Sequence, residues 1–226
     1  MLNTLSKAMG YGAPREENPT TEWLAVSFLT LRKVIGLMGV LFPVVLAFGC
    51  VLLSPLTGLQ ESISAYYGTI MRNVFVGVLF TIGWFLFSYK GYADQDDIAG
   101  DLACLFALGV ALFPITNPEK WVQVMHLIFA ASLFITLAYF SMVLFTKSDG
   151  NMTDRKATRN KIYKTCGWVM LVCIAMILLT KTAFKHWDWI QNLNPTFWLE
   201  TFALWAFGVS WMTKGKLLWA DVVDKD

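Results

Sequence analysis

Charged residues are scarce in this chain of 226 residues: they make up 15% of it, against roughly 25% in a typical soluble domain. Hydrophobic residues make up 56%, and the mean hydropathy is +0.53. This composition argues against a water-soluble globule. The net charge of +2 is also too small for nucleic-acid binding, which needs a concentrated basic face, so we expect no nucleic-acid partner.

Metal-binding and redox motifs are lacking as well. The two histidines, His126 and His186, are too few for a catalytic zinc site with three converging protein ligands. The four cysteines lack the paired spacing of a zinc or disulfide-exchange motif and lie in apolar stretches, where free Cys packs as a small hydrophobe; they are Cys50, Cys104, Cys166 and Cys173. We therefore expect neither a metal nor a cofactor.

The first 15 residues contain no apolar core followed by a small-residue cleavage site, as a secretory signal peptide would. The first transmembrane helix is therefore expected to direct insertion. Because no organelle address is visible either, we expect a multi-pass protein of the cell inner (cytoplasmic) membrane.

The chain contains six apolar runs instead. A helix needs about 20 apolar residues to cross a hydrocarbon core, and each run is long enough or nearly long enough. They cover about residues 34–54, 73–89, 98–115, 121–146, 162–184 and 196–213. We predict an all-α polytopic membrane protein with a six-helix transmembrane bundle over 34–213. Residues 1–33 are predicted to form a cytoplasmic N-terminal segment whose helix, 20–33, lies on the membrane surface or extends the first span. Residues 214–226 form a cytoplasmic tail.

The distribution of basic residues predicts the orientation, because cytoplasmic loops carry the excess of Lys and Arg. Fourteen of the 18 basic residues belong to the loops and ends on one side, so both termini are predicted to be cytoplasmic. The loop over 147–164 holds six of them and is expected to contact anionic lipid. Four aspartates, Asp94, Asp96, Asp97 and Asp101, open the third span, and we expect Asp101, the deepest, to face that basic loop. Glycines 36 and 77 are expected to allow close helix packing.

Three ionisable residues, Arg72, His126 and Glu200, lie within or beside spans, where such groups are costly and therefore informative. All three fall on the predicted outer side, so they can share one layer. One interpretation is a structural ion pair, with Arg72 or His126 as the countercharge of Glu200. The other is an outward-facing pocket that binds a lipid head group or small polar ligand, with Arg72 as the anion contact. Its predicted lining is Ser62, Ser64, Tyr66, Tyr67, Arg72, His126 and Glu200.

Two further functions stay open. A membrane-embedded lipid hydrolase or acyltransferase would use Ser62 or Ser64 as nucleophile, His126 as base and Glu200 as orienting group. The chain has no Gly-x-Ser-x-Gly elbow to hold such a serine. A channel or transporter would need polar residues that continue to the inner side, and the second, fourth and fifth spans are mostly apolar beyond the outer third. The partners expected in every case are membrane lipids, and self-association is left open.

Short motifs at four of the predicted spans are similar to those of a known family. They are Ser62, Ile63, Ser64 and Ala65 followed by Arg72, then Phe113 and Pro114, then His126, then Glu200. Over residues 34–213 the chain resembles the six-span family of damage-regulated autophagy modulators and FGF-receptor-activating proteins, together with its prokaryotic membrane relatives. The resemblance implies a six-helix bundle. Eukaryotic members are linked to lipid-anchor remodelling, autophagy and lysosomes, and no agreed chemistry carries over.

Overall fold

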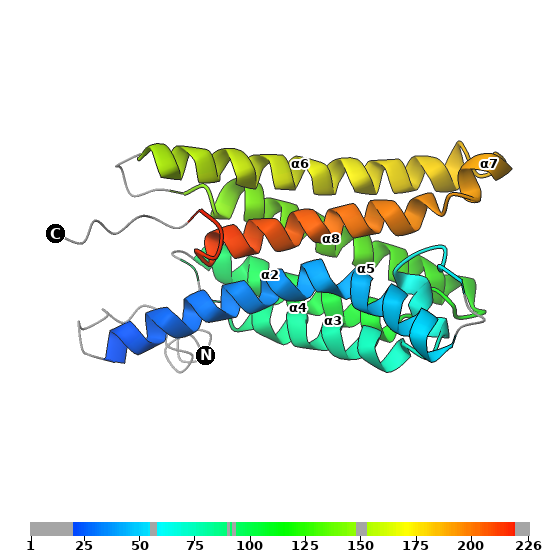
Figure 1. Ribbon diagram of the computed structural model, residues 1–226, viewed down its shortest axis with the longest axis horizontal. Coiled ribbons are helices and arrows are strands. Elements are labelled where there is room, and N and C mark those ends of the chain that lie inside the picture. Colours follow the sequence, from blue (N-terminus) through cyan, green and yellow to red (C-terminus); the bar gives the residue numbers. More distant parts are fainter. Residues whose placement is uncertain (1–19, 55–57, 90, 92–93, 148–152, 220–226) are drawn as a thin grey trace, which may run out of the picture.

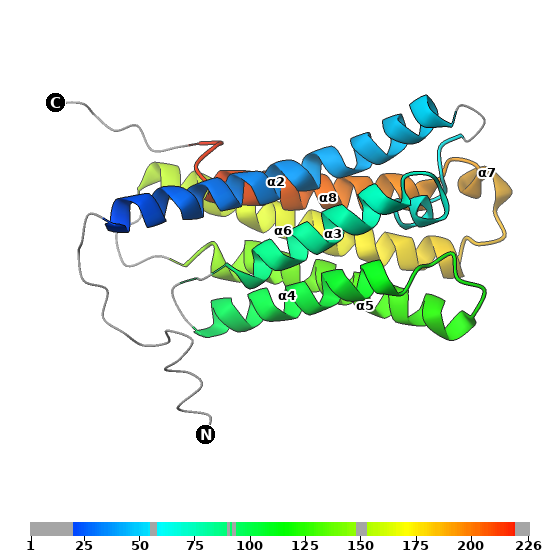
Figure 2. The same cartoon turned by 90° about the horizontal axis from the view of Figure 1, so that it is seen from below.

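The computed structural model describes residues 20–54, 58–89, 91, 94–147 and 153–219, and every regular element within these ranges is helical. Six long helices lie side by side along the long axis of the molecule (Figures 1 and 2). They are α2 (Thr20–Leu53), α3 (Arg72–Phe87), α4 (Asp94–Leu112), α5 (Lys120–Tyr139), α6 (Asp154–Thr182) and α8 (Pro195–Lys214). Each predicted apolar run coincides with one of them. The predicted segments before residue 20 and after residue 219 lie outside the described residues.

Three short elements complete the helical structure of the described residues. A 3₁₀ turn, η1 (Ser64–Gly68), precedes α3, and the short helix α7 (Asp188–Gln191) precedes α8. A π-helical turn, η2 (Phe140–Leu144), continues α5. Because consecutive long helices run in opposite directions, η1 and α7 lie at the same end of the bundle (Figure 1).

Three helical segments are long and apolar enough to cross a membrane: Phe28–Leu53, Lys120–Leu144 and Asp154–Thr182. The helix α3 is apolar but shorter. Large apolar side chains on the outside of the bundle remain uncovered; Phe48, Leu52 and Leu178 are each 64% exposed. Apolar surface on this scale requires an apolar surrounding, which lipid supplies.

The segment 20–33 and the first apolar run form one continuous helix, α2, as in the predicted alternative in which this segment extends the first span. One helix start differs from the sequence-based expectation. The helix α6 begins at Asp154, where the Thr153 hydroxyl accepts a hydrogen bond from the backbone N–H of Lys156 (3.2 Å), as an N-cap does. Residues 154–164, which are most of the predicted basic loop, therefore form about the first three turns of α6.

The expected partner of the basic loop was wrong. Asp96, which is 1% exposed, rather than Asp101 lies against it: Lys147 Nζ is 3.3 Å from Asp96 Oδ2. Asp101 is exposed. Five residues rotate a helix by about 140° beyond one full turn, so the two carboxylates of α4 face different directions.

The helices α2 and α8 approach each other closely at Gly36 and Gly208. A Cβ atom on Gly36 would lie 2.7 Å from the Gly208 carbonyl oxygen, and one on Gly208 would lie 2.6 Å from that of Gly36. Backbone atoms cannot rotate away as a side chain can, so only glycine fits on both helices. Gly77 was expected to serve packing too, but a Cβ there would meet no atom within 4 Å.

We predict that Gly36→Ala and Gly208→Ala each lower the free energy of unfolding by about 1–3 kcal/mol, the usual cost of overpacking. Thermal denaturation of the purified protein in detergent measures the effect. Gly77→Ala, also within a helix, is the matched control and is expected to be neutral or mildly stabilising. Equal melting temperatures for all three variants would show that the α2–α8 crossing is not tight.

Candidate functional site

The bundle has two chemically different ends. We call the end that holds η1 and α7 the η1 end, and the opposite end, where α2 begins and α8 finishes, the basic end (Figures 1 and 2). The predicted pocket residues belong to the η1 end. Their contacts show which of them the fold brings together.

Glu200 links α8 to the connection before η1, residues 58–63. Its carboxylate accepts a hydrogen bond from the backbone N–H of Ile63, and one turn earlier on α8 the backbone N–H of Phe197 donates to the Glu61 carbonyl oxygen (3.0 Å). Each segment thus accepts a hydrogen bond from a backbone N–H of the other. The N–H of Phe197 lies in the first turn of α8, where backbone N–H groups have no partner within the helix. We call this pair of hydrogen bonds the reciprocal contact.

The predicted hydroxyls near Glu200 serve the same connection. Ser62 Oγ accepts from the backbone N–H of Ala65 (3.0 Å), and the Tyr66 hydroxyl accepts from that of Gln60 (3.4 Å). Ser64 and Glu200 both line a hollow of about 50 Å³ that is otherwise apolar. These residues hold the connection in shape.

Arg72 and His126 have separate partners. The Arg72 guanidinium donates to the Tyr67 hydroxyl (2.7 Å) and stacks over the ring, 4.5 Å from its centroid. His126 is 2% exposed, and its Nδ1 is 2.7 Å from the carbonyl oxygen of Phe113, just beyond the end of α4. Within the described ranges, no hydrogen bond or ion pair joins Glu200 to either residue. The seven predicted residues therefore fall into three groups, not one.

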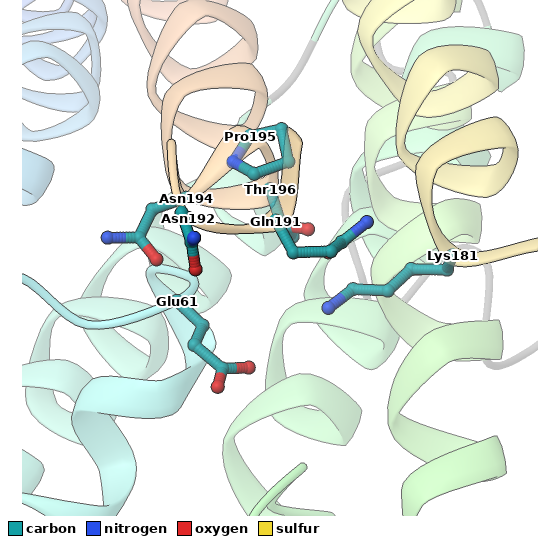
Figure 3. Close-up of a pocket in the computed structure, with 7 residues that line it drawn as sticks. All are labelled: Glu61, Lys181, Gln191, Asn192, Asn194, Pro195 and Thr196. Carbon is teal, nitrogen blue, oxygen red and sulfur yellow. The ribbon is translucent and has the colours of Figure 1, made fainter. Parts of the chain in front are cut away.

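A polar hollow of the η1 end lies beside the reciprocal contact. Its volume is about 430 Å³, and α6, α7, the start of α8 and the segment before η1 contribute to its wall (Figure 3). The lining is more polar than apolar and consists of Glu61, Lys181, Gln191, Asn192, Asn194, Pro195 and Thr196. We call this hollow the polar pocket.

Charges of opposite sign extend into the polar pocket from two walls. Lys181 comes from the last turn of α6 and Glu61 from the connection before η1 (Figure 3). Neither side chain has an ion-pair partner in the part of the chain that the structure describes. The pocket can therefore offer a positive and a negative contact at once.

Neutral polar groups line the wall between the two charges. Thr196 is 5% exposed, and its buried hydroxyl has no hydrogen-bond partner among the described residues. Asn194 adopts a left-handed conformation (φ 50°), which Asn tolerates, and its side chain does not cap α8. Gln191 is fixed, because its amide donates to the carbonyl oxygens of Thr180 (3.2 Å) and Phe184 (3.0 Å). A buried hydroxyl that lacks a partner is costly, so Thr196 marks a place where a ligand or water would bind.

Sequence reasoning missed this pocket. Neither Lys181 nor Glu61 was among the predicted lining residues. The available signal was the group of amide side chains, Gln191, Asn192 and Asn194, directly before Pro195, a good first residue for a helix. Nothing in the sequence places that run next to Glu61, because the reciprocal contact joins segments more than 130 residues apart.

The basic end has its own electrostatics. Lys214, the last residue of α8, follows the predicted sixth span and is partly buried. Burial, together with the charges of Arg32 and Lys156, lowers the pKa of Lys214 to about 7. Asp96 acts in the opposite direction, but it is already paired with Lys147.

Comparison of the chain with protein-family models, with curated proteins and with solved structures finds no match in any of the three. The interpretation of the site therefore depends on the geometry described above.

We predict that Glu200→Ala lowers the free energy of unfolding by about 1–3 kcal/mol, because the Ile63 N–H loses its acceptor. Glu200→Gln keeps an acceptor oxygen and is expected to cost less. Thermal denaturation gives the size of the loss, and limited proteolysis within 58–71 locates it. Glu119→Ala, at an exposed site of the same end, is the control. If Arg72→Ala cost as much as Glu200→Ala, an ion pair would describe Glu200 better than the reciprocal contact.

Proposed function

We propose that this chain is a six-span protein of the cytoplasmic membrane whose polar pocket faces outward and binds a small polar ligand or a lipid head group. The six lengthwise helices and the exposed apolar surface support a multi-pass arrangement. The excess of Lys and Arg on one side of the spans supports an orientation with the basic end in the cytoplasm and the η1 end outside.

The observation that carries the proposal is the pair of charges, Lys181 and Glu61, on the walls of one hollow of about 430 Å³. That volume lies within the range of roughly 300–1,000 Å³ for small-molecule sites. A ligand with an anionic and a cationic group would engage both charges, while the Thr196 hydroxyl and the neighbouring amides would bind neutral polar atoms. Zwitterionic lipid head groups such as phosphoethanolamine have this chemistry.

The hydrolase alternative gains no support from the geometry. Ser62 is engaged with the backbone of its own turn, and His126 Nδ1 is engaged with Phe113. No hydrogen bond joins either candidate serine to His126 within the described ranges. We therefore propose ligand binding rather than acyl transfer. The family resemblance of residues 34–213 stays a hypothesis that fits a six-helix membrane protein with a role in lipid biology.

We predict that the wild-type protein, purified in mild detergent, retains a zwitterionic lipid or small molecule in native mass spectrometry. Lys181→Ala and Glu61→Gln should each reduce retention about tenfold, because each removes a charged contact. Thr196→Val, which keeps the shape and removes the hydroxyl, should reduce it less.

Lys185→Ala and Glu119→Gln are the matched controls, since each changes an exposed charge near the η1 end outside the polar pocket. Both should retain the ligand at the wild-type level. Equal retention in all variants at matched folding, or no ligand in any sample after supplementation with phosphatidylethanolamine, would refute the proposal.

A further inference from the structure

Exposed tryptophans flank the segment 191–196, which contributes most of the lining of the polar pocket. Trp187 and Trp189 precede the segment, and Trp198 on the first turn of α8 follows it; all three are exposed and none lines the pocket. The rings of Trp187 and Trp189 stack with their centroids 6.2 Å apart. Tryptophan is enriched where a bilayer meets water, at the level of the lipid head groups. The three rings therefore indicate that level on the outside of the bundle.

The connection that carries Trp187 is fixed to the wall of the polar pocket. The Gln191 amide, itself part of the lining, donates to the carbonyl oxygens of Thr180 and Phe184, at and just beyond the end of α6. The Trp187 backbone N–H donates to the same Phe184 carbonyl oxygen (3.1 Å), and the two rings pack with their centroids 5.1 Å apart. The depth of the tryptophans in the membrane consequently sets the depth of the pocket, which is that of the head groups.

The lipid-facing surface reaches the edge of the polar pocket. Lys181 follows Leu178 by three residues on α6, and such a pair shares one face of a helix. Leu178 is 64% exposed, as suits contact with lipid. Leu193 lies between the lining residues Asn192 and Asn194, yet it does not line the pocket and is 62% exposed. Acyl chains can therefore lie against the bundle beside the Lys181 wall while a head group occupies the pocket.

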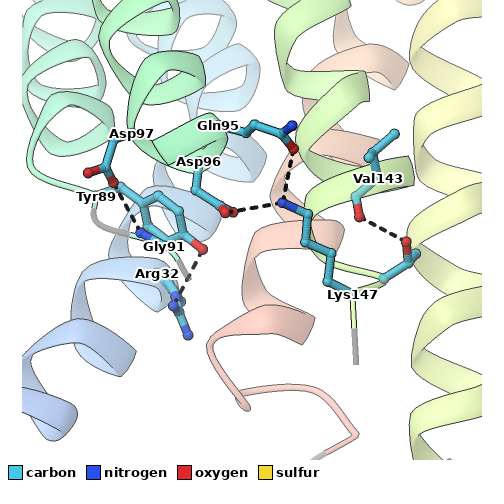
Figure 4. Close-up of polar contacts among 9 residues, drawn as sticks. Arg32, Tyr89, Gly91, Gln95, Asp96, Asp97, Val143 and Lys147 are labelled. Carbon is cyan, nitrogen blue, oxygen red and sulfur yellow. Dashed lines mark hydrogen bonds and ion pairs between the residues drawn. The ribbon is translucent and has the colours of Figure 1, made fainter. Parts of the chain in front are cut away.

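The two charges of the polar pocket are not a structural ion pair. Such a pair exists at the basic end, where Lys147 Nζ and the buried Asp96 carboxylate lie 3.3 Å apart (Figure 4). Lys181 and Glu61 are both exposed and extend from different walls (Figure 3), and no ion pair joins them within the described ranges. The buried Glu200 carboxylate attracts Lys181 but forms no ion pair with it there. The two exposed charges are thus accessible to a ligand.

We propose that the ligand of the polar pocket is a zwitterionic phospholipid, which enters sideways from the outer leaflet and places its phosphate on Lys181 and its amine on Glu61. This inference rests on the function proposed above and adds the source and the direction of the ligand. The phosphate of such a lipid lies between the glycerol and the amine, so it stays nearer the hydrocarbon, where the Lys181 wall is. The Thr196 hydroxyl, which has no partner among the described residues, can donate to an oxygen of the same phosphate.

The first test compares three probes of the full-length protein in a mild non-ionic detergent by native mass spectrometry. Dioleoylphosphatidylethanolamine has both charges and acyl chains, dioleoylphosphatidylglycerol lacks the amine, and glycerophosphoethanolamine lacks the acyl chains. Wild type should bind phosphatidylethanolamine about threefold or more tightly than phosphatidylglycerol, and about tenfold or more tightly than glycerophosphoethanolamine.

Two variants test the direction of the head group. Glu61→Gln should abolish the preference for phosphatidylethanolamine and leave the affinity for phosphatidylglycerol within about threefold of wild type, whereas Lys181→Ala should weaken both lipids about tenfold. Lys185→Ala and Glu119→Gln remove the same charges from exposed positions outside the pocket and should bind like wild type. Melting temperatures check that all variants fold. Equal losses of both lipids in Glu61→Gln, or a loss of phosphatidylethanolamine alone in Lys181→Ala, would overturn the assignment of phosphate and amine.

A second measurement tests entry from the bilayer. In liposomes, with the four buried cysteines replaced by alanine, a nitroxide label on Leu193→Cys should lie at the depth of the lipid phosphates by electron paramagnetic resonance. A label fully in water, or glycerophosphoethanolamine binding as tightly as the lipid, would overturn the inference and leave a pocket for a soluble zwitterion. If no probe binds, or if Lys181→Ala and Glu61→Gln bind every probe like wild type, the proposed function fails as well.

Discussion

The reciprocal contact between the first turn of α8 and the connection before η1 is the interaction on which the η1 end depends. In it, the Glu200 carboxylate of α8 accepts a hydrogen bond from a backbone N–H of the connection. A backbone carbonyl oxygen of the connection in turn accepts one from a backbone N–H of α8. Few other groups could satisfy these amides at the edge of a lipid-facing bundle, where unpaired backbone is costly. As a consequence, Glu61 lies next to the start of α8, and the polar pocket acquires its negative wall.

Charged side chains are arranged differently at the two ends of the molecule. At the η1 end, single charges of opposite sign stand apart across a polar hollow, with amides and a hydroxyl between them. At the basic end, cations of α2, α6 and α8 lie near one another, and Lys214 lies over the Phe145 ring. Between the ends, the buried polar side chains of the described residues are mostly hydroxyls: Ser141 of η2 and Ser210 of α8 hydrogen-bond each other, and Thr201 bonds to a carbonyl oxygen of its own helix. Within the described residues, this separation argues against a continuous polar path from one end to the other.

The sequence was sufficient to predict the six long helices, because apolar runs of this length have few alternatives in a membrane. It was not sufficient for their ends: capping by Thr153 starts α6 well before its apolar run. Nor could it assign partners. One interpretation paired Glu200 with Arg72 or His126, yet a backbone N–H satisfies its carboxylate, and a pattern of side chains does not reveal a backbone donor. Depth along α4 favoured Asp101, but the rotation of the helix, which the sequence does not give, brings Asp96 to Lys147 instead.

The most direct test of the account is the membrane sidedness of the two ends. In a background in which the four buried cysteines are replaced by alanine, Asn192→Cys probes the polar pocket and Lys161→Cys probes the basic end. Intact cells are treated with a membrane-impermeant maleimide before and after permeabilisation. The account predicts that the cysteine at position 192 is labelled in intact cells and the one at position 161 only after permeabilisation. Labelling of both from the same side, or the reverse pattern, would contradict it.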